Sequence, residues 1–285
     1  MKDFQTKSKD YKFFKKSYNL IMEFSEIPQL LTEKIRRRKI PKKETSLSRD
    51  SNLSQRGFFF EMRDTSKEIQ AVANAVGQLT DKGGENSGTC FVLEDKNKYL
   101  VSALHCGNLK DKNALPDYKV IMPDGTEIQL SPASGEVTLQ DPGLDLFVFK
   151  LNNPPDSLPS LKLEKTESMG KKYIKKSFCI GYPYTFLRQR PTVKGPVVSV
   201  GEFIHDPNLY DTEYYVTARI EGGNSGSPII DAGTGGLLGM ATSVVAKPSK
   251  EEGANFHLIN SAYIVPAHQI YLNLLQQQES SSILL

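Results

Sequence analysis

The sequence predicts an all-β fold of short strands, arranged either as barrels or as a sandwich. From about residue 66 onward, apolar runs of strand length alternate with turn residues such as Gly, Pro, Asn and Asp. Few stretches between these runs have the apolar spacing of a helix, and strands this short and numerous are typical of barrels and sandwiches. A chain of 285 residues can bury a substantial core in one large or two modest domains.

The first 65 residues differ from the rest in charge. Residues 1–63 carry 16 Lys and Arg against 8 Asp and Glu, whereas the remainder carries 20 against 25. Phe14, Tyr18 and Ile21 recur at helical spacing, and the polar stretch 44–57 has the composition of a linker. The sequence therefore predicts a basic N-terminal extension and linker over 1–65, helical or disordered, attached to a mildly acidic body.

The run KIRRRKIPKK at 34–43 is the most basic part of this extension. It could bind an anionic partner or be recognised by a nuclear-import receptor, and a solvated charged face explains it equally well. Residues 1–19 lack the apolar core of a secretory signal, no apolar run approaches the ~20 residues of a membrane span, and three cysteines indicate no disulfide framework. We therefore expect an intracellular, cytoplasmic protein, with the nucleus as the alternative.

The apolar runs predict the strands in chain order. They lie at 88–95, 98–105, 118–130, 144–151, 177–183, 195–204, 213–220 and 227–245. Asp124-Gly125 inside the third run indicates a hairpin. A Pro-rich interval at 151–172 divides the runs into two groups of similar size, and no internal repeat is visible.

A helix is expected near the C-terminus. Pro266 suits a first helical position, and Ile270 with Leu274 forms an apolar stripe. The globular part is expected to end at about residue 276, followed by a tail over 277–285.

The stretch EGGNSGSPI at 221–229 places three glycines and two serines within nine positions. A serine hydroxyl attacks a carbonyl only if a base removes its proton and nearby donors stabilise the resulting oxyanion. Gly222, Gly223 and Gly226 allow positive φ values around Ser225, so that backbone N–H groups can point toward a substrate. Ser225 is therefore the candidate nucleophile, with the N–H groups of Gly223 and Ser225 as oxyanion donors; a tight turn is the alternative.

His105 is the candidate general base among the four histidines. It ends the apolar run YLVSALH, where a strand could bury it and hold it rigidly. The others, His205, His257 and His268, lie in polar or helical surroundings that favour a structural role.

Asp145 is the candidate carboxylate that would orient the imidazole, because the apolar run LFVFKL directly after it would anchor it. Asp141 competes for this role, but the neighbouring Pro142 and Gly143 indicate a turn there.

Three pairs of stretches in this order resemble the chymotrypsin-fold serine proteases. They are SGTCFVL with YLVSALHC (87–93 and 99–106), DGTEIQL with DPGLDLFVFK (124–130 and 141–150), and CIGYPY with EGGNSGSPIIDAGTGGLLGMA (179–184 and 221–241). The resemblance covers roughly residues 70–275. It is nearest to the high-temperature-requirement (HtrA) proteases and the glutamyl endopeptidases, which share the G-N-S-G core.

This resemblance implies two antiparallel β-barrels, about 66–152 and 171–276, with the active site between them. It implies a serine endopeptidase that works through an acyl-enzyme, with His105 as base, Asp145 as its orienting carboxylate and Ser225 as nucleophile. Gly223 would supply the second oxyanion N–H. No His, Cys, Asp and Glu cluster has metal-ligand spacing, so we expect neither a metal nor a cofactor.

The chain departs from its relatives at three points. Cys90 and Cys106 match cysteines that form a disulfide in secreted relatives, but without a signal peptide we expect free thiols. Asn224 stands where secreted trypsin-like enzymes have an aspartate that pairs with a freed N-terminal ammonium, so this loop should be ordered without cleavage. Because the chain ends soon after its last helix, we expect no C-terminal PDZ module.

The resemblance places the substrate pocket around Arg219, Ala241 and Thr242. Glutamyl endopeptidases have a histidine at the position of Ala241, so the small, uncharged wall here predicts Val, Ala, Leu or Thr as the P1 residue. Arg219 would favour Asp or Glu if it turned inward, and we expect it to point outward.

A protease-fold module that binds peptides or protein partners without catalysis is the alternative function. The α/β-hydrolases are excluded, because GNSGS lacks the last glycine of G-x-S-x-G and because the order here is His, Asp, Ser.

Overall fold

The computed structural model describes residues 59–162, 173–205, 214–246 and 258–283. Most of the predicted extension, the basic run 34–43 and His257 lie outside these residues. The strands of the described part are β1 (Phe59–Glu61), β2 (Val76–Thr80), β3 (Asn86–Glu94), β4 (Lys98–Ala103), β5 (Lys119–Ile121), β6 (Glu127–Gln129), β7 (Gly135–Asp141), β8 (Leu146–Leu151), β9 (Leu161–Lys162), β10 (Tyr173–Gly181), β11 (Val197–His205), β12 (Tyr214–Val216), β13 (Pro228–Asp231), β14 (Leu237–Ala246) and β15 (Leu258–Pro266). The α-helices are α2 (Lys67–Ala73), α3 (Tyr184–Gln189) and α4 (Ala267–Ile283), and the 3-10 turns are η2 (Met62–Asp64) and η3 (Leu115–Asp117).

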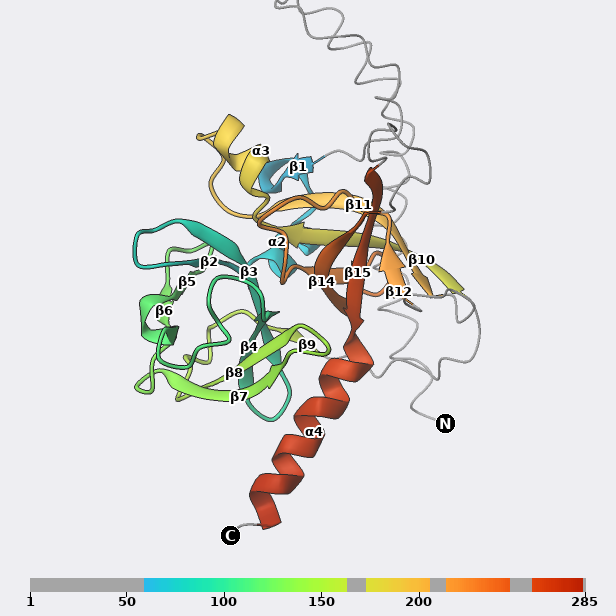
Figure 1. Cartoon of the computed structure of the whole chain (residues 1–285). Coiled ribbons are helices and arrows are strands. Elements are labelled where there is room, and N and C mark those ends of the chain that lie inside the picture. Colours follow the sequence, from blue (N-terminus) through green and yellow to red (C-terminus); the bar gives the residue numbers. More distant parts are fainter. Residues whose placement is uncertain (1–58, 163–172, 206–213, 247–257, 284–285) are drawn as a thin grey trace, which may run out of the picture. The chain divides into compact units, whose positions relative to one another are not determined.

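The first sheet contains β2 to β9. Its strands follow the order β6-β5-β2-β3-β4-β8-β7 with antiparallel pairing, and β9 pairs with β3 in parallel. The expected hairpin is confirmed: β5 and β6 pair, Gly125 has a φ of 89°, and Asp124 Oδ1 accepts from the Thr126 N–H at 2.8 Å. In the described residues the edge strands β6 and β7 do not pair, so this sheet curls without closing (Figure 1).

The second sheet closes into a barrel of six strands. Its order is β11-β10-β13-β14-β15-β12, and β12 pairs back with β11. The expected all-β fold of two antiparallel β-barrels with a C-terminal helix is confirmed, with the difference that within the described residues only the second barrel closes. Within the Pro-rich interval 151–172, β9 pairs with β3 and so belongs to the first sheet.

β1 lies within residues 1–65, which the sequence predicts to be an extension outside the globular part. It pairs antiparallel with the β11 residues Val197–Ser199 and so lengthens the edge of the second sheet. The compact unit that contains both sheets accordingly begins at Gly57, ahead of residue 66. α2 follows at once, and its first turn is capped by Ser66, whose Oγ accepts from the Ile69 N–H at 3.4 Å.

The central strands of the first sheet are buried on both faces. In β4 and β8, only the first residue of β4 and the fifth of β8 are not fully buried. Within the second barrel, Ala218, Ala241 and Ala262 share one apolar core with larger side chains from β10, β11, β12, β13 and β15.

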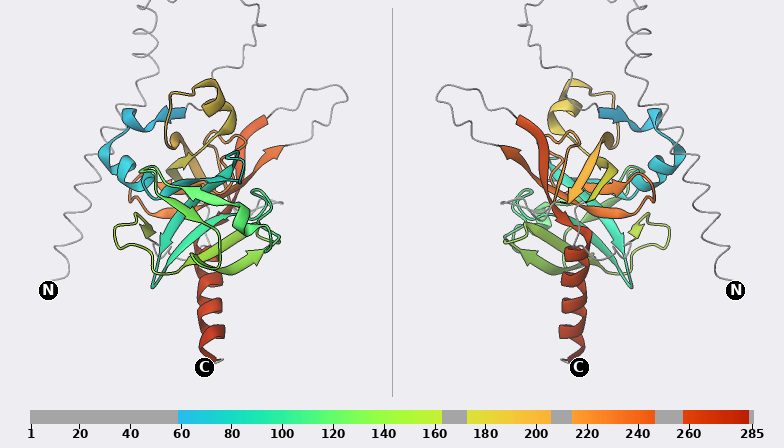
Figure 2. Two further views of the ribbon diagram at one scale, coloured as in Figure 1. Left: turned by 90° about the vertical axis from the view of Figure 1, so that its left-hand side faces the viewer. Right: turned by 90° about the vertical axis from the view of Figure 1, so that its right-hand side faces the viewer.

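α4 connects the two halves. It lies against β7 of the first sheet and against β14 and β15 of the second, and it projects beyond both (Figures 1 and 2). Ile270 and Leu274 are buried, which confirms the predicted apolar stripe. The helix continues to Ile283, so most of the residues expected to form a tail extend it instead.

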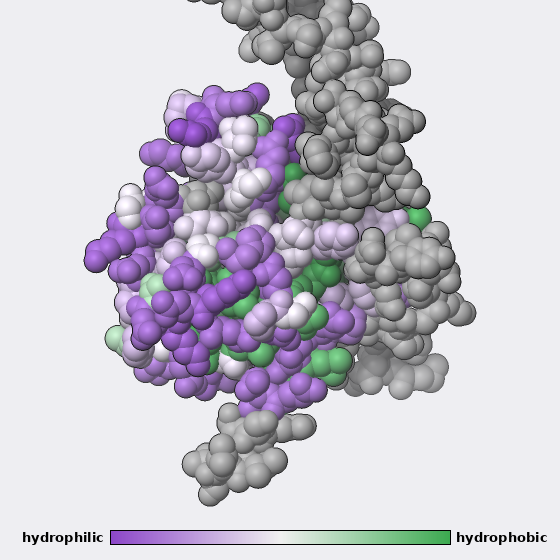
Figure 3. Space-filling model, in the orientation of Figure 1, coloured by the Kyte–Doolittle hydropathy of each residue, from purple (hydrophilic) through white to green (hydrophobic). Residues whose placement is uncertain are grey.

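The surface shows no large apolar patch in the described residues. The face seen in Figure 3 is mainly hydrophilic, with a few hydrophobic residues between the hydrophilic ones. The large exposed hydrophobic side chains are spread over four elements: Ile174, Tyr184, Val200 and Leu272. None of the described helices has the length and apolar content that a membrane crossing requires.

The three cysteines, Cys90, Cys106 and Cys179, are free and buried, which confirms the expectation of free thiols. Burial raises the pKa of the Cys106 and Cys179 thiols to about 12 and pushes the pKa of Cys90 higher still.

The burial of Leu274 on α4 predicts how its removal changes the free energy of unfolding. Leu274→Ala should lower the free energy of unfolding by about 2–5 kcal/mol, because the vacated volume lies inside the interface between helix and sheets. Leu272→Ala on the same helix is the matched control, since its side chain is 51% exposed, and it should change the value by less than about 0.5 kcal/mol. Urea unfolding followed by circular dichroism measures both; equal losses would contradict the packing described.

The burial of the three thiols predicts slow alkylation in the native protein. At pH 8 a thiol with a pKa of about 12 is thiolate in roughly one molecule in 10⁴, and the thiolate is the reactive form. Native protein should therefore resist iodoacetamide at pH 8 over a period in which urea-unfolded protein is alkylated at all three cysteines. Intact-mass measurement counts the additions, and rapid alkylation of Cys106 in native protein would show that the thiol is accessible.

Candidate active site

Strand pairing brings His105 and Asp145 together. β4 ends at Ala103, two residues before His105, and Asp145 directly precedes β8. Ala103 pairs with Leu146, so the residue before β8 faces the turn that follows β4. Ser225 comes from the other half of the molecule, in the loop between β12 and β13.

The three side chains form a continuous chain of hydrogen bonds. Asp145 Oδ2 lies 2.5 Å from His105 Nδ1, and His105 Nε2 lies 2.9 Å from Ser225 Oγ. Because an ionised carboxylate can only accept, Nδ1 carries the proton and Nε2 is left as an acceptor toward the serine hydroxyl. Asp145 also accepts from the backbone N–H of His105 through Oδ1 at 2.9 Å, which fixes the carboxylate plane relative to the ring.

Asp145 adopts an unusual backbone conformation. Its φ is 55°, in the left-handed region that non-glycine residues seldom occupy and that costs roughly 1–2 kcal/mol. The N–H of Leu104 donates to the Asp145 carbonyl at 3.0 Å, which holds this conformation from the neighbouring turn. Strain of this kind concentrates at functional sites.

Asp141, the competing carboxylate, is occupied in the turn. Its Oδ1 accepts from the N–H groups of Gly143 at 2.8 Å and Leu144 at 3.1 Å. The interpretation of Pro142 and Gly143 as turn residues therefore agrees with the structure.

The expectation that a strand would bury His105 is wrong. The His105 side chain is 44% exposed, because β4 ends at Ala103 and the chain turns before the histidine is reached. Asp145 behind it is 29% exposed, and Ser225 is half-buried. The Nε2 edge of the imidazole can thus contact a substrate, while Nδ1 is held by the Asp145 carboxylate.

Backbone hydrogen bonds orient the peptides around Ser225. The Gly222 carbonyl accepts from the Tyr184 N–H at 2.6 Å, and the Asn224 carbonyl accepts from the Ser227 N–H at 2.9 Å. In a planar trans peptide the N–H points opposite to the C=O. These two bonds therefore turn the N–H groups of Gly223 and Ser225 away from Tyr184 and Ser227. Within the described part of the chain neither N–H donates to another group.

Glycine is required at two of these positions. Gly223 has a φ of 95° and Gly226 one of 85°, both in the left-handed region. A Cβ on Gly226 would also meet the Thr89 carbonyl oxygen at 2.0 Å. Asn224 between them is buried, and its N–H donates to the Glu221 carbonyl at 3.0 Å, so hydrogen bonds and packing order this loop.

Thr89 and Tyr184 are residues whose role the sequence did not indicate. Thr89 on β3 donates its N–H to the Ser225 carbonyl at 2.9 Å and its Oγ1 to the Gly223 carbonyl at 2.7 Å. Both lie inside stretches of the family resemblance. Since five of the six groups in the three hydrogen bonds of Thr89 and Tyr184 to this loop are backbone groups, only the threonine hydroxyl leaves any signal in the sequence.

The structure places the three expected pocket residues in different surroundings. Thr242 is adjacent to the nucleophile, since its carbonyl accepts from Ser225 Oγ at 2.9 Å. Ala241 is fully buried in the core of the second barrel, against which the partly buried Ile220 packs. Arg219 donates from Nε to Glu221 Oε1 at 2.8 Å and lies over the ring of Phe59.

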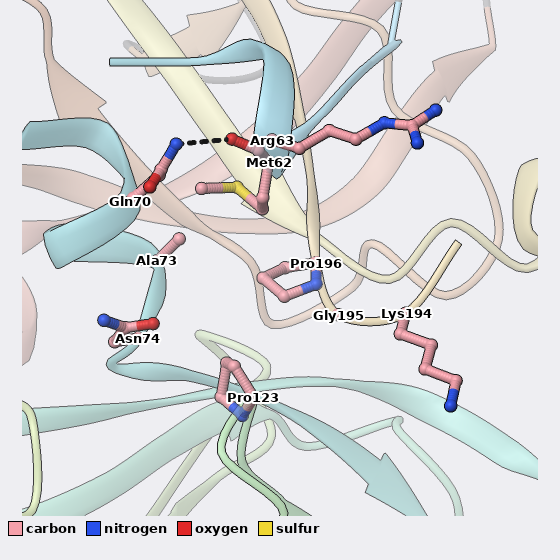
Figure 4. Close-up of a pocket in the computed structure, with 9 residues that line it drawn as sticks. All are labelled: Met62, Arg63, Gln70, Ala73, Asn74, Pro123, Lys194, Gly195 and Pro196. Carbon is pink, nitrogen blue, oxygen red and sulfur yellow. Dashed lines mark hydrogen bonds between the residues drawn. The ribbon is translucent and has the colours of Figure 1, made fainter. Parts of the chain in front are cut away.

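A separate pocket of about 190 Å³ lies away from these residues (Figure 4). It opens between η2, α2, Pro123 and the segment before β11, and none of the site residues above lines it. Its lining is Met62, Arg63, Gln70, Ala73, Asn74, Pro123, Lys194, Gly195 and Pro196. Gln70 on its wall is held by the carbonyls of Met62 and Thr65, each at 3.0 Å, so this side chain serves the local fold.

The remaining described histidines pack against aromatic rings. His205 is buried on β11 with its ring centroid 4.6 Å from that of Tyr214, and His268 lies 5.7 Å from the same ring. Among the described residues, no three His, Cys, Asp or Glu side chains gather in a way that could hold a metal ion.

Solved structures share this fold. A variant of the HtrA-type protease AlgW with a tripeptide matches with a TM-score of 0.50 and 23% identity over 74% of this chain and 63% of the other. A serine endoprotease from Yersinia pestis matches with a TM-score of 0.50 and 19% identity, over 74% of this chain and 66% of the other. The chain thus spans less than two thirds of either protein. No curated protein matches it in sequence.

A family profile for the trypsin-like peptidase domain matches residues 88–240. The matched range is more than half of the chain, and it contains His105, Asp145 and Ser225. With the two barrel halves and the similarity to HtrA-type serine proteases, this match shows that the chain belongs to the trypsin-like peptidase family.

Proposed function

We propose that the protein is a serine endopeptidase in which Ser225, His105 and Asp145 act as a catalytic triad. The observation that carries this proposal is the unbroken hydrogen-bond chain from Asp145 Oδ2 through both ring nitrogens of His105 to Ser225 Oγ. Its three members come from both halves of a trypsin-like peptidase fold.

His105 accepts the serine proton while Ser225 Oγ attacks the scissile carbonyl. The imidazolium that forms is stabilised by the Asp145 carboxylate, and it then protonates the leaving amine. Water attacks the resulting acyl-enzyme, with His105 again as the base. None of these steps needs a metal or a cofactor.

The serine hydroxyl has two acceptors within reach, His105 Nε2 and the Thr242 carbonyl, both at 2.9 Å. One hydroxyl proton can be donated to only one of them at a time. Attack proceeds from the rotamer that donates to His105, because a carbonyl oxygen cannot take the proton. The Thr242 carbonyl therefore competes with His105 for the hydroxyl proton before the attack.

The N–H groups of Gly223 and Ser225 would stabilise the tetrahedral oxyanion. Both peptides are oriented from behind, by Tyr184 and Ser227, so no reorganisation is needed when charge develops. The alternative function is a module of this fold that binds peptides or protein partners without catalysis.

The pocket proposal concerns the residue on the acyl side of the scissile bond. Ala241, which the resemblance places at the pocket wall, is small and uncharged, and in the structure it is fully buried in the core of the second barrel. Arg219 is already neutralised by Glu221, so an acidic substrate residue would have to compete with a carboxylate of the protein itself. Since burying an unpaired charge is costly, we expect Val, Ala, Leu or Thr at P1.

Loss of the nucleophile should abolish activity. Ser225→Ala should lower peptide hydrolysis by a factor of roughly 10⁶, since the acyl-enzyme can no longer form.

A fluorophosphonate probe should label native protein at Ser225, located by mass spectrometry, and should not label unfolded protein, in which the serine has no base. Failure of native wild-type protein to label would favour the binding-module alternative.

The two aspartates of the turn before β8 provide a matched pair. Asp145→Asn should lower kcat by roughly 10⁴, because an amide can donate to His105 Nδ1 and so favours the wrong tautomer. Asp141→Asn should stay within a few-fold of wild type, since asparagine also accepts hydrogen bonds in such turns. Steady-state kinetics on a peptide substrate measure both, and an equal loss in the two variants would contradict the assigned roles.

The pocket proposal is tested by profiling cleavage on a peptide library. Small and medium aliphatic residues or Thr should be enriched at P1, and the profile of Arg219→Ala should keep the same ranking even if its rate changes. A wild-type preference for Glu or Asp that disappears in Arg219→Ala would overturn the proposal.

A further inference from the structure

β1 contacts Arg219 and α3, although it precedes both sheets in the chain. It is paired with β11, with Phe59 opposite Ser199. Figures 1 and 2 show β1 and α3 side by side at one end of the second barrel. The ring of Phe59 contacts two neighbours that both lead to the Ser225 loop.

The first neighbour is Arg219, whose guanidinium lies over the Phe59 ring at 4.8 Å from its centroid. Arg219 is held at its backbone as well, because Ser199 Oγ donates to its carbonyl at 2.8 Å. Its side chain holds Glu221 through the Nε bond of 2.8 Å, and the Glu221 carbonyl accepts from the Asn224 N–H. This route ends one residue before Ser225.

The second neighbour is Phe186 on α3, with its ring centroid 5.2 Å from that of Phe59. Tyr184, the first residue of α3, donates its N–H to the Gly222 carbonyl. That bond orients the peptide whose other end is the Gly223 N–H. α3 is only six residues long and lacks a side-chain N-cap bond, so its position depends on packing such as the contact between Phe186 and Phe59.

We propose that Phe59 is a positioning residue for the oxyanion loop. It holds α3 in place, and through Tyr184 it keeps the Gly222 carbonyl in the orientation that turns the Gly223 N–H toward a substrate. Through Arg219 and Glu221 it also supports the turn that the Asn224 N–H closes. The inference rests on the proposed function for its kinetic consequence, and its structural consequence is measurable without any activity.

The experiment uses the full chain and four variants. Phe59→Ala removes the ring, Phe59→Leu keeps apolar bulk but removes the ring face, and Phe59→Tyr restores the ring. Phe60→Ala is the matched control, because its side chain leaves the opposite face of the same short strand and it pairs only with Val198. All four are compared below their unfolding temperatures.

Hydrogen–deuterium exchange gives the first readout. In Phe59→Ala and Phe59→Leu, the peptides that contain the Tyr184 and Asn224 amides should exchange at least about tenfold faster than in wild type. Peptides from the core strands β4 and β8 should be unchanged. Phe60→Ala and Phe59→Tyr should resemble wild type throughout.

Steady-state kinetics give the second readout. Losing one oxyanion donor costs about 10²–10³ in kcat, so a loop that is only partly misoriented should lose roughly tenfold in Phe59→Ala. KM should stay within about twofold, because substrate binding does not use the oxyanion contact, and Phe59→Tyr should recover kcat. A purely structural role would instead lower the active fraction and leave kcat per labelled serine unchanged.

The outcomes separate the two proposals. If exchange and kcat are unchanged in both Phe59→Ala and Phe59→Leu, or if Phe60→Ala matches them, the positioning role is wrong. If wild type shows neither hydrolysis nor fluorophosphonate labelling, the proposed function fails, and faster exchange at Tyr184 and Asn224 in the Phe59 variants still supports the link between β1 and the loop.

Discussion

Two hydrogen bonds from Thr89 tie the nucleophile loop of the second barrel to a central strand of the first sheet. The candidate base lies on the first sheet and the candidate nucleophile on the second half, so their 2.9 Å separation depends on how the halves are joined. Gly226 allows the close approach at this point, since any Cβ there would meet the Thr89 carbonyl. The geometry of the candidate site is therefore a property of the contact between the halves.

Peptide planarity extends this constraint to the candidate oxyanion donors. The carbonyls of Gly222 and Asn224 accept hydrogen bonds from the N–H groups of Tyr184 and Ser227. The carbonyls of Glu221 and Gly223 accept from the Asn224 N–H and Thr89 Oγ1 and support the same loop. Fixing a carbonyl fixes the following N–H in the opposite direction. A loop held by these hydrogen bonds needs no salt bridge at position 224. Secreted trypsin-like enzymes, which the chain resembles, instead have an aspartate there that pairs with a freed N-terminal ammonium.

Each charged side chain of the candidate site contacts a partner close by. Asp145 faces His105, and Arg219 faces Glu221, so each carboxylate close to Ser225 has a partner within the described residues. The Cys106 thiol beside His105 donates from Sγ to the Ser225 carbonyl at 3.4 Å, and its raised pKa keeps it protonated. The serine is thus the accessible nucleophile in contact with the base.

The sequence by itself determined most of the strands, though not β2, β7 and β15. It also determined the hairpin at Asp124-Gly125, the apolar stripe of α4 and the residue types of the candidate triad. These features follow from side-chain periodicity and chemistry, which are written along the chain. The tertiary structure alone decided the pairing of β1, the exposure of His105, the strained backbone of Asp145 and the bonds that Thr89 and Tyr184 make to the loop. Most of those bonds join backbone atoms, which nearly every residue carries, so which of them form depends on long-range packing and leaves little trace in residue identity.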